Sequence, residues 1–156
     1  MTVEIERRFL LADDSWREAA GEPLVWQQGY LSVEKERTIR VRIIGSQAWL
    51  TLKGYISDMT RSEFEYEIPL AHAQAMMADM CPFKMEKYRY RVEFEGFVYE
   101  IDEYFGDNAP LIVAEIELPS EDTEFPKPSW LGKEITADGK FTNAYLSKHP
   151  YSSWTE

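Results

Sequence analysis

The sequence predicts an α+β fold that is mainly β, with about eight strands in an antiparallel sheet and two or three helices. Charged and apolar residues alternate with a period of two in segment after segment, the pattern of strands that bury one face. The connections are short, which favours antiparallel neighbours. At 156 residues and 44% hydrophobic content, the chain can bury a sizeable core, and we expect residues 1–156 to form one domain.

The first predicted strand is Val3–Leu10, where Glu4, Glu6 and Arg8 share one face because side chains alternate. Taken alone, this face could simply be solvated, so a functional reading depends on later strands repeating the pattern. Residues that can cap a helix follow, and they predict a short helix at Trp16–Ala20.

Three strands are predicted next, with turns between them. Val25–Val33 alternates and places Tyr30 on its more polar face. Thr38–Ile44 alternates cleanly and has only arginines as charged residues on its polar face. A glycine turn leads into Ala48–Gly54, whose polar face ends with Lys53.

The next predicted strand, Thr60–Ile68, gathers Arg61 and three glutamates on one face, and a proline ends it. Ala71–Met80 has helical composition and apolar spacing, and a Cys-Pro pair stops it.

Lys84–Glu95 and Phe97–Phe105 both alternate and are separated by a glycine, which predicts a hairpin. Leu111–Leu118, the last predicted strand, carries only glutamates on its polar face. The chain beyond Pro119 is predicted as loop, except for a short closing helix at Thr142–Lys148.

The net charge of −11 argues against a general nucleic-acid binder, whose footprint is basic. No apolar run approaches the roughly 20 residues of a membrane span. Charged residues at Glu4, Glu6, Arg7 and Arg8 occupy the place of a signal peptide's apolar region, so we expect a cytoplasmic protein. The single Cys81 cannot form an internal disulfide.

The polar faces of all strands together hold two charged sets of opposite sign, and the signs segregate by strand. An ordinary solvated sheet would mix in more Ser, Thr and Gln. The cationic set is Arg8, Arg40, Arg42, Lys53, Arg61, Lys87, Arg89 and Arg91. The acidic set is Glu4, Glu6, Glu63, Glu65, Glu67, Glu100, Asp102, Glu115 and Glu117.

If the sheet closes, the charged face can line the inside of a barrel while the apolar face packs outward. Desolvated charges cost several kcal/mol each, so they must be paired or bound to a ligand. A polyphosphate with divalent cations satisfies both sets, because arginine forks bind phosphate and carboxylates bind Mg²⁺ or Mn²⁺. The two histidines, His72 and His149, are predicted as surface residues.

The segment Glu4-Ile5-Glu6-Arg7-Arg8 resembles the E-x-E-x-K signature of the CYTH, or triphosphate tunnel metalloenzyme, family. Further segments resemble the family in the same order along nearly the whole chain. These are Thr38-Ile39-Arg40-Val41-Arg42, Leu52-Lys53-Gly54, Arg61-Ser62-Glu63-Phe64-Glu65, Lys87-Tyr88-Arg89, Glu100-Ile101-Asp102, Ala114-Glu115-Ile116-Glu117, Gly132-Lys133-Glu134-Ile135-Thr136 and Asn143. One residue departs from the signature: Arg8 stands where lysine is expected, which leaves substrate preference open.

This resemblance implies an eight-stranded antiparallel closed β-barrel around a tunnel, with a few helices packed outside. It also implies dependence on Mg²⁺ or Mn²⁺, two per site, and a triphosphate substrate. The expected reaction is hydrolysis of inorganic tripolyphosphate to pyrophosphate and phosphate. Thiamine triphosphatase, class IV adenylate cyclase and a non-catalytic polyphosphate or nucleotide sensor stay as alternatives, although the full acidic set argues against a sensor.

The expected roles divide by charge. Substrate-binding residues are Arg8, Arg40, Arg42, Lys53, Arg61, Lys87 and Arg89. Metal ligands are Glu4, Glu6, Glu63, Glu65, Asp102, Glu115 and Glu117. As catalytic residues we expect Lys87 and Tyr30, with Tyr30 assisting the attacking water beside Lys87, although Tyr30 could also be a wall residue. Tyr151 and Trp154 could join a homodimer contact or pack on the barrel exterior.

Overall fold

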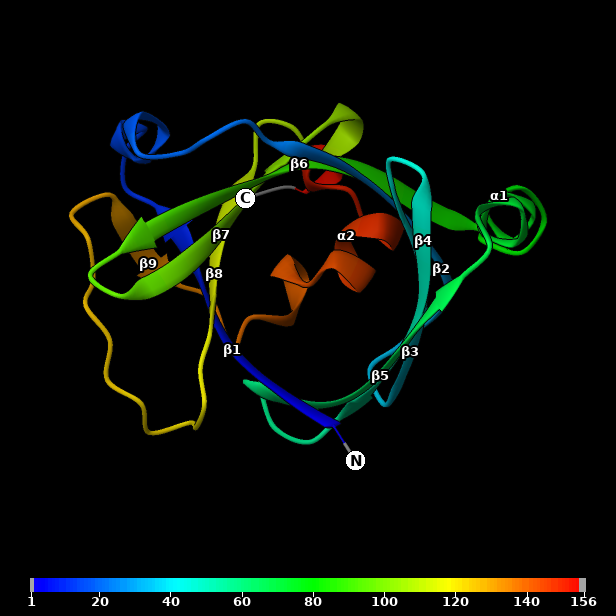
Figure 1. Cartoon of the computed structure of the whole chain (residues 1–156), viewed down its shortest axis with the longest axis horizontal. Coiled ribbons are helices and arrows are strands. Elements are labelled where there is room, and N and C mark those ends of the chain that lie inside the picture. Colours follow the sequence, from blue (N-terminus) through cyan, green and yellow to red (C-terminus); the bar gives the residue numbers. More distant parts are fainter. Residues whose placement is uncertain (1, 155–156) are drawn as a thin grey trace.

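In a computed structural model, which describes residues 2–154, nine strands and two α-helices make up the fold (Figure 1). The expected domain of residues 1–156 also includes Met1, Thr155 and Glu156, which lie outside the described residues. In chain order the elements are β1 (Thr2–Leu11), β2 (Leu24–Glu34), β3 (Arg37–Ile44), β4 (Gln47–Tyr55), β5 (Thr60–Ile68), α1 (Leu70–Asp79), β6 (Phe83–Phe94), β7 (Phe97–Tyr104), β8 (Ile112–Glu117), β9 (Leu131–Glu134) and α2 (Asn143–Lys148).

Eight of the strands close into an antiparallel barrel, in the order β1-β5-β4-β3-β2-β6-β7-β8 and back to β1. The closure is made by β1, because its residues 2–5 pair with β5 and its residues 6–10 pair with β8. Figure 1 shows these strands as a ring. The predicted eight-stranded closed antiparallel barrel is therefore confirmed.

The apolar faces of the strands point out of the barrel and are covered on two sides. α1 packs over β3 and β4, where Val41, Ile43 and Ala48 are buried. On the opposite side, Trp16 and Trp130 of the connecting segments pack with buried residues of β1, β7 and β8. Burial of this outer layer leaves the charged face of each strand inside the ring.

One end of the barrel interior is apolar, and α2 lies there. The inward-facing rows of three strands reach Met85, Tyr104 and Val113, which form a cluster with Ile135 and with Leu146 of α2. α2 therefore lies within the ring of strands in Figure 1, whereas α1 lies outside it. The expectation of helices packed outside the barrel holds for α1; α2 differs because Leu146 is buried at the apolar end of the interior.

The segment beyond Pro119, predicted as loop, contains the additional strand β9. It pairs with the second half of β1, where Phe9 faces Glu134 and Leu11 faces Leu131. The short helix expected at Trp16–Ala20 is a single 3-10 turn instead.

Tyr151 and Trp154 pack against the cluster around α2, where Trp154 also contacts the ring of Phe141. Both residues are only partly buried, so this packing leaves open the homodimer contact considered for them. Neither α-helix in the described part of the chain has the length and apolar character needed to cross a membrane.

Candidate active site

The barrel interior contains two adjoining hollows of about 580 and 220 Å³. They share Glu4, Glu6, Arg40, Lys53 and Asn143 as lining residues, so they form one continuous tunnel. Four of these five residues come from β1, β3 and β4, and Asn143 begins α2. The alternation of the strands therefore does place charged side chains of both signs around a common cavity.

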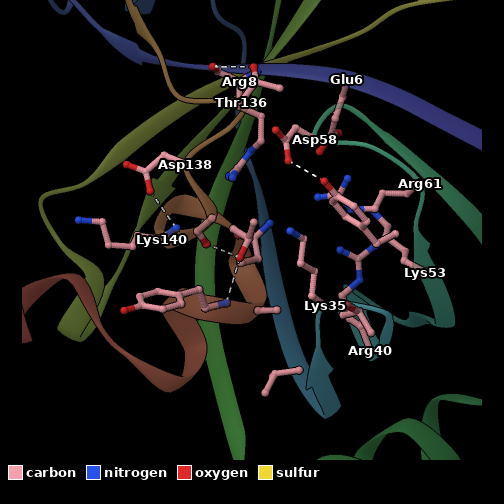
Figure 2. A pocket seen from close by; sticks show the side chains of 18 of the residues that line it. Glu6, Arg8, Lys35, Arg40, Lys53, Asp58, Arg61, Thr136, Asp138 and Lys140 are labelled. Carbon is pink, nitrogen blue, oxygen red and sulfur yellow. Dashed lines mark hydrogen bonds between the residues drawn. The ribbon is translucent and has the colours of Figure 1, made fainter. Parts of the chain in front are cut away.

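The larger hollow is mainly cationic. Figure 2 shows Lys35, Lys53 and Arg61 on one side of it, facing Asp138 and Lys140 of the C-terminal segment on the other. The charged residues that line it are Arg8, Lys35, Arg40, Lys53, Arg61, Lys140 and Lys148, with Glu4, Glu6, Asp58 and Asp138. The excess of positive charge in this hollow would attract an extended anion.

The smaller hollow is mainly acidic. Its charged lining residues are Glu4, Glu6, Glu63, Glu65, Glu100, Glu115 and Glu117, with Arg40, Arg42, Lys53 and Arg89. The tunnel is therefore polarised along its length, and the residues shared by both hollows mark where the cationic half meets the acidic half.

Lys53 stands at this junction and pairs with two carboxylates. Its Nζ lies 2.8 Å from Glu4 Oε1 and 3.6 Å from Glu63 Oε2. Burial acts to raise the pKa of Glu4, but the charge and hydrogen bond of Lys53 outweigh it and lower that pKa. Burial likewise acts to lower the pKa of Lys53, and Glu4 outweighs it. Both side chains are thus held in their charged forms.

Glu6 lies at the same junction and is close to two other carboxylates, Glu115 and Glu4. Burial, followed by repulsion from Glu115 and Glu4, raises its pKa to about 8. Glu117, on the adjacent β8, also has a raised pKa, again through burial and then Glu4. This group of oxygen donors needs a cation, and hard divalent ions prefer such donors.

The carboxylates fit a metal ion that remains partly hydrated. Within residues 2–154, no three His, Cys, Asp or Glu side chains are arranged so that they could hold one metal ion by themselves. Mg²⁺ usually keeps several waters and binds through one or two carboxylates together with substrate phosphates. The donors around Glu6 suit that mode, in which a phosphate chain completes the coordination.

Two arginines of β3 share one carboxylate of β5. Arg42 Nη2 lies 3.3 Å from Glu65 Oε1, and Arg40 Nη2 lies 4.0 Å from Glu65 Oε2. Thr51 Oγ1 donates a hydrogen bond of 2.7 Å to the same Oε2. The two guanidinium groups exceed their shared counterion by one charge, which leaves them able to bind a further anion.

Lys87, Arg89 and Asp102 form a buried ionic cluster between β6 and β7. Asp102 Oδ2 accepts from Lys87 Nζ at 2.7 Å and from Arg89 Nη2 at 2.9 Å, and Oδ1 accepts from Arg89 Nε at 2.8 Å. Burial acts to raise the pKa of Asp102, but Arg89 and Lys87 outweigh it and lower that pKa far below its ordinary value. Burial lowers the pKa of Lys87 to about 8, against the attraction of Asp102. Asn143 Oδ1 lies 3.5 Å from Lys87 Nζ and also accepts from Tyr104.

Arg8 connects β1 to the C-terminal segment and to β8. Its Nη1 donates to the carbonyl of Phe141, and its Nε lies 3.4 Å from Glu115 Oε2. Its backbone N–H donates to Thr136 Oγ1. The arginine that stands at the lysine position of the signature thus uses its forked head to contact two segments.

Most of the sequence-predicted site residues line the tunnel, and two do not. Lys87 and Asp102 are fully buried behind the lining, so neither is exposed to the cavity. Tyr30 lines the larger hollow, but on β2 it lies four residues from Trp26, the partner of Lys87. That is about 13 Å along the strand, so the structure does not bring Tyr30 and Lys87 together.

Two charged residues of the strand faces lie outside the lining. Arg91 is exposed and pairs with Glu93 at 3.5 Å, while Glu67 accepts from Gln47 at 3.4 Å. His72 is exposed as predicted; His149 is also exposed but lies at the edge of the larger hollow.

Several lining residues were missed by sequence reasoning because they are not on the alternating strand faces. Lys35 lies in the turn after β2, and Lys140 and Lys148 lie in the C-terminal segment. Trp26 does follow the alternation of β2, so its inward position could have been found from the two-residue period.

Three comparisons with known proteins agree with this geometry. An inorganic triphosphatase from Acetivibrio thermocellus is 40% identical over 157 residues, which cover 100% of both chains. An inorganic triphosphatase from Nitrosomonas europaea is 32% identical over 149 residues, or 93% of this chain and 97% of its own. A solved crystal structure of an inorganic triphosphatase is 30% identical, with a TM-score of 0.65 over 92% of this chain and 96% of that one.

The family model of the CYTH domain matches residues 2–145, a range that includes all nine strands and most of the tunnel lining. Both the strand order and the charged interior lie within the matched residues. The chain belongs to the CYTH domain family.

Proposed function

We propose that this protein hydrolyses a linear triphosphate in its tunnel with the help of divalent metal ions. The preferred substrate is inorganic tripolyphosphate, which would yield pyrophosphate and phosphate. One observation carries the proposal: the cationic and acidic hollows are continuous, so a phosphate chain and its metal ions can be bound side by side. The names of the relatives at 40% and 32% identity support the same substrate class.

The cationic residues would bind and orient the phosphates. Those available in the lining are Arg8, Arg40, Arg42, Lys53, Arg61 and Arg89. Phosphoryl transfer depends mainly on positioning and on neutralising charge, which a rigid barrel wall can supply. Lys87 would act from behind the lining, by holding Asp102 and Asn143 in place.

The acidic residues would hold Mg²⁺ or Mn²⁺, two per site. A bound divalent ion neutralises phosphate charge and lowers the pKa of a coordinated water. Glu4, Glu6, Glu115 and Glu117 are the main candidate ligands, with Glu63 and Glu65 beside the cationic wall. Asp102 is the weakest of the expected ligands, because both of its oxygens are engaged by Lys87 and Arg89.

Further parts of the proposal concern the whole chain. We propose that residues 1–156 form one cytoplasmic domain that binds neither nucleic acid nor membranes. We propose a homodimer as a further possibility, with the partly buried Tyr151 and Trp154 as candidates for its contact.

A product panel tests the function directly. Purified protein with Mg²⁺ or Mn²⁺ would be offered tripolyphosphate, thiamine triphosphate and ATP, and phosphate, pyrophosphate and cyclic AMP would be quantified. We expect pyrophosphate and phosphate from tripolyphosphate, at the highest kcat/KM of the three. Cyclic AMP as the main product, or tight binding of tripolyphosphate without turnover, would overturn the proposal.

Two matched variants of β5 test whether the activity measured in the panel comes from the tunnel. Glu63→Gln removes a carboxylate from the lining and should lower metal-dependent turnover at least about tenfold. Glu67→Gln is four residues along the same strand face but outside the lining, and it should keep wild-type activity. Equal effects of the two substitutions would count against the tunnel as the active site.

A further inference from the structure

Trp26 lies on β2, between the two strands that carry inward-facing arginines. Its ring centroid is 4.0 Å from Arg89 Cζ of β6 and 4.5 Å from Arg42 Cζ of β3. Lys87 Nζ lies 5.2 Å from the same ring. Trp26 lines the smaller hollow with a residue exposure of only 8%. One aromatic ring thus contacts three cations from two different strands.

These cations repel one another. Burial, followed by the charge of Arg40, lowers the pKa of Arg42, and Arg89 contributes in the same direction. Acidic partners hold some of the cations but also cancel their charge, as Asp102 does for Lys87, and as Asp102, Glu100 and Glu115 do for Arg89. Arg42 pairs with Glu65, a carboxylate that it shares with Arg40. An aromatic face attracts a guanidinium group and leaves its full positive charge available to a ligand.

The polar atom of Trp26 takes no part in holding it. Its indole Nε1 is buried and has no hydrogen-bond acceptor among residues 2–154. The contacts of this side chain with charged groups are therefore made by its ring.

We propose that Trp26 is a positioning residue, whose ring holds Arg42 in place to bind a phosphate chain without neutralising it, beside Arg89, which carboxylates also hold. The inference rests on the proposed function, because it assigns these arginines to the triphosphate. It adds an uncharged residue to the charged groups that the proposed function assigns to the tunnel.

The test compares a variant that removes the ring with one that keeps a ring. Trp26→Leu should lower kcat for tripolyphosphate by about tenfold or more, while KM changes less than about threefold, because the charges remain but lose their placement. Trp26→Phe keeps an aromatic face without an N–H and should recover activity to within about threefold of wild type. Calorimetric titration with tripolyphosphate in the absence of metal counts the binding-competent molecules, so that kcat refers to folded protein.

Two further variants separate positioning from simple packing. Among residues 2–154, Arg42 is the one cation in contact with the Trp49 ring, at 4.8 Å, and Trp49 lies outside the lining of both hollows. Trp49→Leu should therefore cost less activity than Trp26→Leu. In an Arg42→Gln background, the effect of Trp26→Leu should shrink at least about threefold, because the arginine that the ring positions is gone.

Three results would overturn the inference. They are a wild-type kcat in Trp26→Leu, an equal loss in Trp26→Phe, and an undiminished effect of Trp26→Leu in the Arg42→Gln background. If wild-type protein binds tripolyphosphate but hydrolyses no triphosphate, the proposed function is wrong, but the role of Trp26 can still be tested. The affinity of each variant for tripolyphosphate then decides it. Weaker binding by Trp26→Leu but not by Trp26→Phe would then support it, and equal binding by both would overturn it.

Discussion

Glu6 carries the carboxylate whose ionisation in the folded protein is most strongly opposed among those of the tunnel junction. With a folded pKa of about 8 against an ordinary 4.5, it keeps a proton between pH 4.5 and 8 that the unfolded chain has released. In the metal-free protein, stability should therefore fall as the pH rises through this window. Glu6→Gln should remove that fall, which we expect to be up to about 4 kcal/mol in the free energy of unfolding between pH 5 and pH 8. Urea denaturation at pH 5 and pH 8 measures it, and identical pH slopes for both proteins would contradict the prediction.

Asp102 is the counterion that keeps two cations stable in the barrel wall. Asp102→Asn is nearly isosteric but leaves Lys87 and Arg89 without their shared negative charge, and it should cost about 3–5 kcal/mol in the free energy of unfolding. The control is Glu93→Gln, which breaks an exposed pair with Arg91 and should cost less than about 1 kcal/mol. Urea denaturation measures both free energies of unfolding. Similar losses for the two variants would show that the buried cluster stabilises the protein no more than a surface pair does.

At the scale of single residues, the two-residue period predicted which side chains point inward but not how deep each one lies. Arg40 and Lys87 follow the same rule, yet Arg40 lines both hollows and Lys87 is sealed behind the lining. Depth is set by neighbours from other strands and from α2, such as Asn143, which the sequence brings close only after folding. The position of a residue along the barrel axis was also not predicted, as Tyr30 shows. Its distance from Lys87 depends on the register in which β2 pairs with β6.

At the scale of elements, β9 is a four-residue strand whose attachment depends on side chains. Arg7 Nε donates to Glu134 Oε2 at 2.8 Å, and Thr136 donates to the same carboxylate. Glu134→Gln should weaken this contact by about 0.5–1 kcal/mol and speed amide hydrogen exchange in β9 more than in β8. Lys133→Gln, on the same strand but exposed, is the matched control and should leave exchange unchanged. Unchanged exchange in Glu134→Gln would show that β9 is held by its backbone alone.

Two short elements near the C-terminus were not fully predicted. β9 was missed, and α2 was predicted at the right residues but outside the barrel. A strand of four residues shows too few alternations to be distinguished from a loop, so β9 carried no usable signal. The position of α2 did leave a signal, because the inward rows change from charged residues to Met85, Tyr104 and Val113 at one end. An apolar patch inside an otherwise ionic barrel requires an apolar cover, and Leu146 of α2 supplies it.

At the scale of the whole molecule, a ligand that bridges the two hollows should stabilise the native barrel. Under the proposed function, tripolyphosphate with Mg²⁺ would bind surfaces from several strands at once, and these surfaces are assembled only in the folded state. At a free concentration about 100-fold above Kd, the gain in free energy of unfolding should be about 2.7 kcal/mol. Thermal unfolding with and without the ligand measures it. Sodium sulfate with Mg²⁺ at equal ionic strength is the control, and an equal shift with sulfate would indicate a general salt effect.

The closure of the ring through β1 has a consequence for biosynthesis. Residues 6–10 leave the ribosome well before their partners on β8, which are more than a hundred positions later in the chain. Until those partners emerge, the nascent barrel is an open sheet with two unpaired edges and with its ionic lining still hydrated. The tunnel can therefore form only after β8 has been synthesised, because β1 must pair with it to close the ring.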